Sequence, residues 1–358
     1  MLPTSHRDDD MGQRRAPRRE PSAQRVLDAP GRIRLDYFDA TEFPRWLATT
    51  GESPLAVISF GAPVASSLPC PVLTLDLPEL NGGAHLEVWS SDQPTTVHRM
   101  GEFTATTSGD LLFATLQLDE TSNGDLRRAT ETAYRQLLQH LRTLGFPYLW
   151  RIWNFFPRIN EQEQGLERYR QFCVGRYQAL AEALPGFPAS LPAGTAVGTR
   201  SGPLQIYVLA GVHPALHLGN PRQIHAYEYP DEYGPCSPSF ARATLARTER
   251  GSQLFIAGTA SVVGHESRHH GNPEAQVRET VENLRALLAH AGAIAEPFTD
   301  GPAPAGLYKV YVRRPEQLAA IRQALKVPFF AESRMLYLQG DLCRQELSVE
   351  IEGLLTTD

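Results

Sequence analysis

The chain of 358 residues is poor in cysteine. Its four cysteines, Cys70, Cys173, Cys236 and Cys343, are scattered, and no two of them form a CxxC pair. Zinc ribbons and thioredoxin-like redox sites require that spacing, and disulfide frameworks require a denser set. The cysteine pattern therefore suggests neither a zinc ribbon nor a disulfide framework, and it predicts free thiols.

The chain also lacks an excess of positive charge, because its formal net charge is -6. Nucleic-acid binding needs a basic face. The one dense basic run, Arg14 to Arg19, lies in a leader that also contains Asp8 to Asp10. We expect residues 1–30 to form a disordered, solvated leader, and we expect no nucleic-acid partner.

Long hydrophobic runs are absent as well. No stretch reaches the apolar length of a bilayer-spanning helix, and the leader has no apolar core of the kind found in secretory signals. We therefore expect a cytoplasmic protein without a membrane partner. With 42% hydrophobic residues, the chain has material for one large core or for two linked domains.

Two long segments of the sequence follow the same plan, which includes one long helix each. In the second segment the helix is expected to begin after Asn272, with Pro273 in its first turn, and to close at Gly292. In the first segment Asp125 and Gly145 bracket a helix of the same length. The matching apolar faces are Thr130, Tyr134, Leu137, Leu141 and Leu144 in the first helix and Val277, Val281, Leu284, Leu288 and Ala291 in the second.

Matching strands and shorter helices surround the two long helices. The expected strands are Leu111 to Gln117, Trp150 to Phe156, Gln205 to Leu209 and Ile224 to Tyr229 in the first segment, and Gln253 to Thr259, Lys309 to Arg313, Met335 to Gln339 and Leu347 to Leu354 in the second. The expected shorter helices are Glu167 to Leu184 and Pro315 to Leu325. Such self-similarity indicates an old tandem repeat.

Two further stretches complete this plan. Strands at Leu55 to Phe60, Val72 to Leu77 and His85 to Trp89 are interpreted as completing the first half, and the Pro/Gly-rich run Leu184 to Gly202 as a loop. The predicted fold class is α/β: a tandem pair of α+β modules with mixed sheets, each packed by one long helix. The predicted divisions are a leader at 1–30, an N-terminal module at 31–230 and a C-terminal module at 231–358.

The segment His265 to His269 matches the zinc-protease pattern HExxH letter for letter. That pattern binds zinc only on a helix, which places both imidazoles on one face. Gly264 precedes the segment and Gly271 to Pro273 follow it, so a loop is predicted here and no metal site is expected.

Glu350 and Glu352 alternate with Val349 and Ile351 near the end of the chain. In a strand of period 2 both carboxylates point to one face. A solvated edge strand explains this pattern for an ordinary β protein. A glutamate in a partly desolvated pocket has a raised pKa instead and donates a proton near neutral pH.

Two segments resemble the chorismatase family: Leu254 to Ser267, which contains Gly258-Thr259-Ala260-Ser261, and the tail Leu342 to Glu352. The second half also resembles the RidA/YjgF family, in the Asn283-Leu284 to Ala291-Gly292 helix and in the Val349 to Glu352 ending. The resemblance implies a RidA/YjgF-like (chorismate-mutase-like) fold for each module. Where RidA enzymes carry a Ser-Gly pair for imine hydrolysis, this chain has Ala257-Gly258, which puts that activity in doubt.

The chorismatase resemblance implies cleavage of chorismate to pyruvate and 3-hydroxybenzoate, without a cofactor, with Glu350 as the general acid. Gly258 and Cys343 together look characteristic of members that make 3-hydroxybenzoate, and Arg344 is expected to promote thiolate character in Cys343. Because chorismate carries two carboxylates, at least two arginines are needed as anchors. Arg334 is favoured by its separation from Glu350, as in RidA enzymes. The other candidate substrate-binding residues are Ala257, Gly258, Arg168, Arg170, Arg313, Arg242, Phe240 and the phenol of Tyr207, with Arg176 also considered.

Several alternatives stay open. The alternative products are 3,4-dihydroxycyclohexa-1,5-diene carboxylate, formed by hydrolysis, and a mixture of 3- and 4-hydroxybenzoate. A non-catalytic RidA-like module that binds a small acid is a further alternative. An older label for such sequences, pteridine-dependent dioxygenase, finds no supported iron triad. The oligomeric state is left open between a monomer and a homotrimer.

Overall fold

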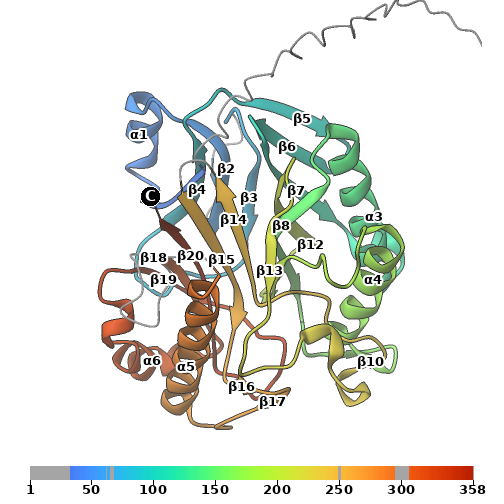
Figure 1. Ribbon diagram of the computed structural model, residues 1–358, viewed down its shortest axis with the longest axis vertical. Helices are drawn as coiled ribbons and strands as arrows, with labels where there is room; N and C mark the ends of the chain where they lie inside the picture. The colour runs from blue at the N-terminus through green and yellow to red at the C-terminus, as the bar shows by residue number, and fades with distance from the viewer. Residues whose placement is uncertain (1–32, 62, 65–67, 249–250, 295–305, 358) are drawn as a thin grey trace, which may run out of the picture.

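The computed structural model describes residues 33–61, 63–64, 68–248, 251–294 and 306–357. The leader expected at 1–30 lies outside the described residues. Three sheets meet in the interior, and helices α1, α3, α4, α5 and α6 cover them from outside (Figure 1). Among the described residues, no helix combines the length and the apolar character that crossing a bilayer requires.

The sheet of the first module has the order β11-β8-β12-β7-β6-β5. Its strands are β5 (Thr96–Met100), β6 (Phe103–Ser108), β7 (Leu111–Leu118), β8 (Tyr148–Pro157), β11 (Ala193–Thr199) and β12 (Leu204–Gly211). Helices α3 (Leu126–Leu144) and α4 (Arg168–Ala183) pack on it, after the short helix α2 (Glu120–Asn123) and the hairpin β9 (Gln162–Glu163) with β10 (Leu166–Glu167).

The sheet of the second module reads β19-β18-β20-β15-β14-β13. Its strands are β13 (Leu216–Leu218), β14 (Ala243–Thr248), β15 (Gly251–Thr259), β18 (Gly306–Val312), β19 (Arg334–Gln339) and β20 (Val349–Thr357). Its other elements are α5 (Pro273–Gly292), α6 (Leu318–Ala324), the hairpin β16 (Val262–Val263) with β17 (Glu266–Ser267), and the 3-10 turns η1 (Ala226–Glu228), η2 (Asp231–Tyr233), η3 (Pro315–Gln317) and η4 (Pro328–Phe330).

The two sheets correspond strand for strand, including the direction of every pairing. β8 pairs with β11 in parallel and with β12 antiparallel, just as β18 pairs with β19 and β20. The remaining pairs are antiparallel in both sheets. The predicted tandem pair of α+β modules is therefore confirmed.

Residues 33–91 form a third sheet, and this corrects the interpretation that the strands at Leu55 to Phe60, Val72 to Leu77 and His85 to Trp89 complete the first half. The sheet has the order β1-β4-β2-β3, from β1 (Ile33–Asp39), β2 (Ser53–Phe60), β3 (Val72–Leu75) and β4 (His85–Ser91), with α1 (Phe43–Thr49) outside. β2 pairs with β3 in parallel and with β4 antiparallel, and β4 pairs with β1 antiparallel. Read from β3, this repeats the first four strands of each module.

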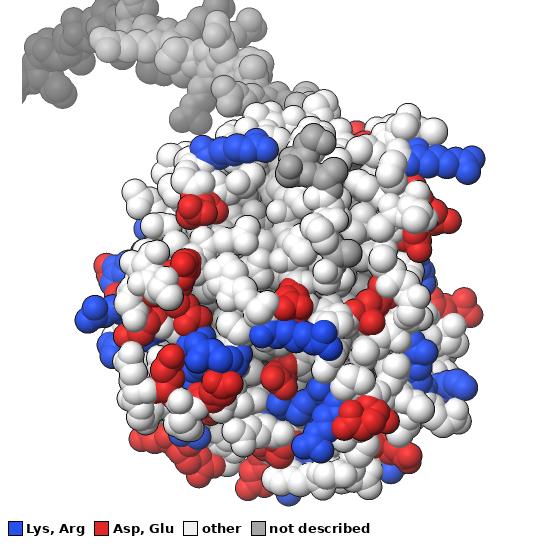
Figure 2. All heavy atoms as spheres, turned by 180° about the vertical axis from the view of Figure 1, so that it is seen from behind, with Lys and Arg blue, Asp and Glu red and all other residues white. Residues whose placement is uncertain are grey.

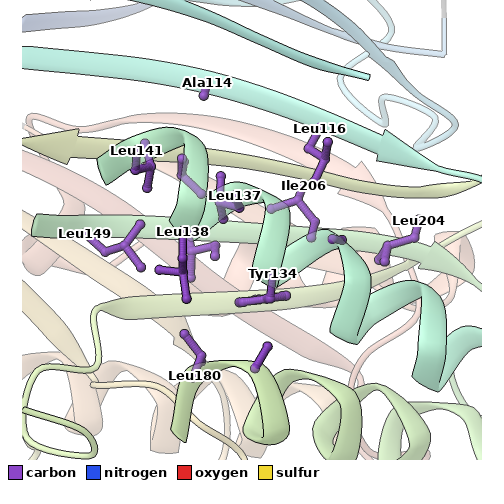
Figure 3. Packing of buried hydrophobic residues seen from close by; sticks show 14 of the residues in the cluster. Ala114, Leu116, Tyr134, Leu137, Leu138, Leu141, Leu149, Leu180, Leu204 and Ile206 are labelled. Atoms are coloured by element: carbon purple, nitrogen blue, oxygen red, sulfur yellow. The ribbon is translucent and has the colours of Figure 1, made fainter. Parts of the chain in front are cut away.

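The long helices begin and end close to the predicted residues. The Asp125 side chain accepts a hydrogen bond from the Arg128 N–H, and Gly145 ends α3 in the left-handed region. The Asn272 side chain accepts from the Ala275 N–H at the start of α5. The predicted apolar faces are buried, apart from the half-buried Leu144. Figure 3 shows side chains of α3 packed between the sheet and Leu180 of α4.

Strand β11 lies inside the run Leu184 to Gly202, which the sequence predicted as a loop. All seven of its residues are buried. A Cβ on Gly194 would lie 2.8 Å from the Phe240 Cβ, and one on Gly198 would lie 2.6 Å from the Ile159 Cγ2. These glycines allow neighbouring segments to pack closely. Because glycine is also typical of turns, the sequence pattern was interpreted as a loop. β11, and not Gln205 to Leu209, is the counterpart of β19.

The stretch Ile224 to Tyr229 was predicted as a strand, but it contains only the 3-10 turn η1. It belongs to the segment that crosses between the two modules. The strands change sheet between Gly211 and Leu216. The division between modules expected at residues 230 and 231 stays a prediction. The position at which the strands change sheet does not favour it.

Charged residues do not form a field of one sign on the face opposite to that of Figure 1. Figure 2 shows Lys and Arg interspersed with Asp and Glu over its lower part, and few charges above. A mixed surface of this kind provides no long-range attraction for a polyanion on that face.

We expect Leu137→Ala to lower the free energy of unfolding by about 2–5 kcal/mol, because it opens a cavity beneath α3. Leu137 is 1% exposed, whereas Leu216, the matched control, is 45% exposed. Leu216→Ala should change stability by less than about 0.5 kcal/mol. Urea unfolding of both variants checks this, and equal effects would contradict the packing described.

Candidate active site

A cavity of about 350 Å³ lies between the two modules. Its walls come from α4 and β11 of the first module, from the crossing segment Gln223 to Arg242, and from β15, β20 and the loop Cys343 to Leu347 of the second module. A volume of this size is typical of sites for small molecules. The tandem arrangement thus creates a site that neither module has alone.

Glu350 of β20 faces this cavity and is only 4% exposed. Among the described residues its carboxyl has no hydrogen-bond partner. Burial raises the pKa of Glu350 to about 8, and the neighbouring carboxylate Glu352 adds to that rise. Near neutral pH the group is therefore a carboxylic acid, as the sequence pattern predicted for a desolvated glutamate.

Glu352 points to the same side of β20, but it is fully paired. Lys309 Nζ and Arg151 Nη2 each lie 2.7 Å from its carboxylate. The Thr195 hydroxyl donates to it at 2.6 Å and the Trp153 indole N–H at 3.0 Å. Burial opposes its ionisation, but Lys309 and Arg151 hold the pKa of Glu352 below its usual value. Two glutamates on one strand therefore differ in protonation.

Two buried arginines line the cavity without a carboxylate partner among the described residues. Arg176 of α4 is 1% exposed and lies 4.7 Å over the Phe172 ring. Arg242 is 5% exposed and donates to the Tyr229 hydroxyl at 2.6 Å. The Nε atoms of both arginines lack partners. A buried cation without a counter-ion is costly, so the two guanidinium groups are suited to bind anionic groups of a ligand.

Gly258 lies directly against the acid, at a register shift between β15 and β20. A Cβ at this position would lie 2.1 Å from the Glu350 Oε1. Any side chain here would therefore displace the carboxyl. The Gly258 N–H donates to the Thr195 hydroxyl at 2.9 Å, which fixes this part of β15. Gly258, which was expected among the substrate-binding residues, thus leaves room for the acid itself.

Cys343 lines the cavity close to Glu350, but it is a neutral thiol. Burial, and to a lesser extent the neighbouring Glu350, raises its pKa to about 12 against the smaller opposing effect of Arg344. This corrects the expectation that Arg344 promotes a thiolate. The Arg344 guanidinium instead lies 4.2 Å over the Tyr233 ring and donates to the His265 carbonyl at 2.8 Å.

Of the other expected binding residues, Arg170 and Phe240 line the cavity. Arg170 is paired with Glu167 at 3.3 Å. Phe240 supports Arg242, whose guanidinium lies 4.9 Å from the ring. Ala257 is buried beside Gly258 and does not line the cavity.

Arg334 and Tyr207 do not lie at the cavity, which overturns the preference for Arg334 as an anchor. Arg334 is half exposed at the start of β19 and bonds to Asp36 and the Tyr37 carbonyl of the third sheet. Its separation from Glu350 suggested proximity, but β19 and β20 are not neighbours in the sheet. Tyr207 is buried at the centre of the molecule, where it accepts from Lys309 Nζ at 2.7 Å.

Arg168 and Arg313 also lie outside the cavity lining, and both serve the structure. Arg168 is buried between Glu120 and Glu163. Arg313 pairs with Asp341 at 2.8 Å and donates to carbonyls of the loop that carries Cys343. Their charges are therefore already used within the protein.

Sequence reasoning missed most of the cavity lining. Arg176 was considered but not selected; its signal was a charge at core spacing in the apolar run Phe172 to Gly175. Thr195, Tyr229 and Glu346 gave no signal, because long-range packing alone brings their segments together.

The HExxH segment is no helix, as predicted. It forms the hairpin of β16 and β17 and the turn after it, with His269 at φ 60°. His265 Nδ1 lies 3.2 Å from the Tyr233 hydroxyl, and His269 pairs with Glu279 at 3.0 Å. Within the described ranges, no group of three or more metal-ligating side chains is arranged to hold an ion.

A protonated buried acid beside two unpaired arginines forms the kind of site that protonates a small dianionic ligand. Residues 87–210 match the family described as chorismatase FkbO/Hyg5-like, N-terminal. A 3-hydroxybenzoate synthase of Streptomyces hygroscopicus is 34% identical over 328 residues, covering 87% of this chain and 94% of that protein. A chorismatase of Streptomyces rapamycinicus is 32% identical over 292 residues, covering 80% of this chain and 86% of that protein.

Solved structures agree with these relatives. A chorismatase crystal structure matches with a TM-score of 0.82 at 30% identity, covering 91% of this chain and 98% of that chain. NMB1025 of Neisseria meningitidis, a member of the YjgF family, is 16% identical over 37% of this chain and 98% of that chain, with a TM-score of 0.27. The chain belongs to the chorismatase family, and its fold is that of the matched chorismatase crystal structure.

We expect the Glu350 carboxyl to keep its proton up to a pH of about 8. Infrared spectra recorded across pH should therefore show a protonated carboxyl band at pH 7 that fades with a midpoint near 8. Glu350→Gln should lack this band and serves as the reference spectrum. A midpoint near the ordinary glutamate value of about 4.3 would contradict the described environment.

Proposed function

We propose that this protein is an enzyme that cleaves chorismate to pyruvate and 3-hydroxybenzoate, with Glu350 as the general acid. The 3-hydroxybenzoate synthase that matches most of the chain supports the reaction. The observation that carries the mechanism is the burial of Glu350 in the wall of the cavity between the two modules, which raises its pKa to about 8. Such an acid is protonated near neutral pH and still strong enough to donate.

The two unpaired arginines suit the two carboxylates of chorismate. One carboxylate is on the ring and the other on the enolpyruvyl arm. We assign Arg176 and Arg242 as their anchors, since each is buried in the cavity wall without a counter-ion. Arg176 lies on α4 of the first module and Arg242 at the end of the crossing segment, which fits a substrate held between them, with Arg170 as a further cation at the half-exposed side.

The first chemical step is proton transfer from Glu350 to the enolpyruvyl methylene. The carbon attached to the ether oxygen becomes an oxocarbenium ion, and the ether bond to the ring weakens. Because the acid is neutral before the transfer and anionic after it, the anion forms beside the new cation. Stabilising charge that develops in a dry site is a general source of rate enhancement.

The second step releases pyruvate. The neighbouring ring hydroxyl attacks the ring carbon that holds the ether, the bond between that carbon and the ether oxygen breaks, and the electron pair goes to the departing pyruvate. The proton of the attacking hydroxyl returns to the Glu350 carboxylate. The resulting arene oxide opens to 3-hydroxybenzoate as the ring carbon loses a proton and the oxygen gains one. The neutral thiol of Cys343 is suited to donate a hydrogen bond to the opening oxygen. Chorismate equals the sum of both products, so the reaction as written requires no redox cofactor.

Water is the competing nucleophile in the hydrolytic alternative. Its addition to the oxocarbenium carbon gives 3,4-dihydroxycyclohexa-1,5-diene carboxylate and pyruvate. Gly258 and Cys343, the pair that resembles aromatising members, favour the intramolecular route. A mixture of 3- and 4-hydroxybenzoate and a non-catalytic binding module are the rival hypotheses for the function. The cytoplasmic location stays a prediction, and the oligomeric state stays open between a monomer and a homotrimer.

Chorismate incubated with the protein should yield equal amounts of pyruvate and 3-hydroxybenzoate, measured by a coupled dehydrogenase assay and by chromatography. Glu350→Gln should lower kcat by at least about 10²-fold, since it removes the transferable proton but keeps the shape. In deuterated water, trapped pyruvate should carry a single deuterium in its methyl group. Ligand binding without pyruvate release would favour the binding module, and the dihydrodiol as sole product would favour hydrolysis.

Arg176→Lys and Arg242→Lys should each weaken chorismate binding by about 10-fold or more in KM, because lysine cannot form a bidentate pair with a carboxylate. Arg334→Lys is the matched control, since Arg334 lies away from the cavity. Steady-state kinetics of the three variants test the assignment. A larger effect at Arg334 than at Arg176 and Arg242 would overturn it.

A further inference from the structure

Four buried charges lie at the centre of the molecule, where the three sheets meet. This central charge cluster consists of Glu87 of β4, Arg151 of β8, Lys309 of β18 and Glu352 of β20, none more than 3% exposed. Lys309 Nζ lies 2.7 Å from both carboxylates, and Arg151 pairs with Glu352 alone. Charges of two signs balance within the cluster, as buried charges must.

Of the two carboxylates in the cluster, Glu352 is the one that acts on the acid. Glu352 follows Glu350 by two positions on the same side of β20. The Thr195 hydroxyl, which lines the cavity, donates to Glu352 and accepts from the Gly258 N–H. Gly258 in turn lies against the Glu350 carboxyl. Glu87 is attached instead to Trp89 and Tyr207, on the other side of Lys309.

The charges around Glu350 oppose one another. Arg151, Arg242 and Arg313 favour its ionised form, whereas burial and the charge of Glu352 favour the protonated form. The thiol of Cys343 is neutral and adds no charge. Removal of the Glu352 charge would leave a buried acid facing arginines, with Arg151 no longer neutralised. In such surroundings a carboxyl loses its proton more readily.

We propose that Glu352, held ionised by Lys309 and Arg151, is a positioning residue whose charge keeps the proton on Glu350. The role of that proton in catalysis rests on the proposed function, but the location of the proton does not. The junction of three sheets thereby sets the protonation of an acid in the cavity between two of them.

The test compares two isosteric variants of the full chain, Glu352→Gln and Glu87→Gln. Both remove one negative charge from the central charge cluster, but only the first removes the one beside Glu350. The midpoint of the infrared titration of the Glu350 carboxyl, with Glu350→Gln as the reference spectrum, should move downward by about one pH unit or more in Glu352→Gln. The shift in Glu87→Gln should be less than half as large.

Pyruvate release provides a second readout. In the unaltered protein kcat/KM should fall as pH rises through about 8, because only the acid form donates a proton. In Glu352→Gln this decline should move to lower pH with the infrared midpoint. Loss of activity in all proteins, with the infrared shift intact, would reject the proposed function and leave this inference standing.

The inference is overturned if both variants shift the Glu350 midpoint equally, or if neither does. Circular dichroism and urea unfolding establish that each variant is folded. If Glu352→Gln does not fold, the double variant Glu352→Gln with Lys309→Gln removes a whole ion pair and keeps the cluster balanced. Its Glu350 midpoint should also fall, because Arg151 then lacks its partner carboxylate; an unchanged midpoint overturns the inference.

Discussion

The contact between Lys309 and the two carboxylates of Glu87 and Glu352 is the constraint on which the rest of the structure depends. One ammonium group joins the third sheet to the second module, and Arg151 joins the first module to the same Glu352. A buried network of this kind adds little net stability over an apolar core, but each member requires the others in place. It therefore fixes how the three sheets meet, and with that the cavity.

The local elements of this protein were predictable from sequence because their signals are local. Asp125 and Asn272 predict where the two long helices begin, and the apolar spacing from Val277 to Ala291 predicts the buried face of the second one. Strand alternation placed Glu350 and Glu352 on one face, but it was the family resemblance that selected Glu350 as the acid. β11 was not predictable, because Gly194 and Gly198 are required by close contacts with Phe240 and Ile159, which are remote in the sequence.

The arginines show the limit of sequence reasoning for the site itself. A sequence reveals six candidate arginines but not which of them already have counter-ions. Arg168, Arg313 and Arg334 are paired with acidic residues from other elements, while Arg176 and Arg242 are not. Only the assembled structure separates these groups, because Glu120, Asp341 and Asp36 lie 48, 28 and 298 positions from the arginines with which they pair. An arginine is available to bind an anionic ligand only when no carboxylate of the protein already pairs with it.

The threefold repetition of the sheets also explains why one cavity carries the acid. β4, β12 and β20 occupy equivalent places, and Glu87, Tyr207 and Glu352 meet at the centre from them. Two residues earlier on these strands stand His85, Gln205 and Glu350. His85 pairs with Glu79, six residues earlier, and Gln205 donates to the Thr74 carbonyl of the third sheet. Both side chains are satisfied internally, whereas Glu350 faces open space. The fold thus provides three equivalent positions. The side chains at two of them, His85 and Gln205, bind internal partners, and the third, Glu350, faces the cavity.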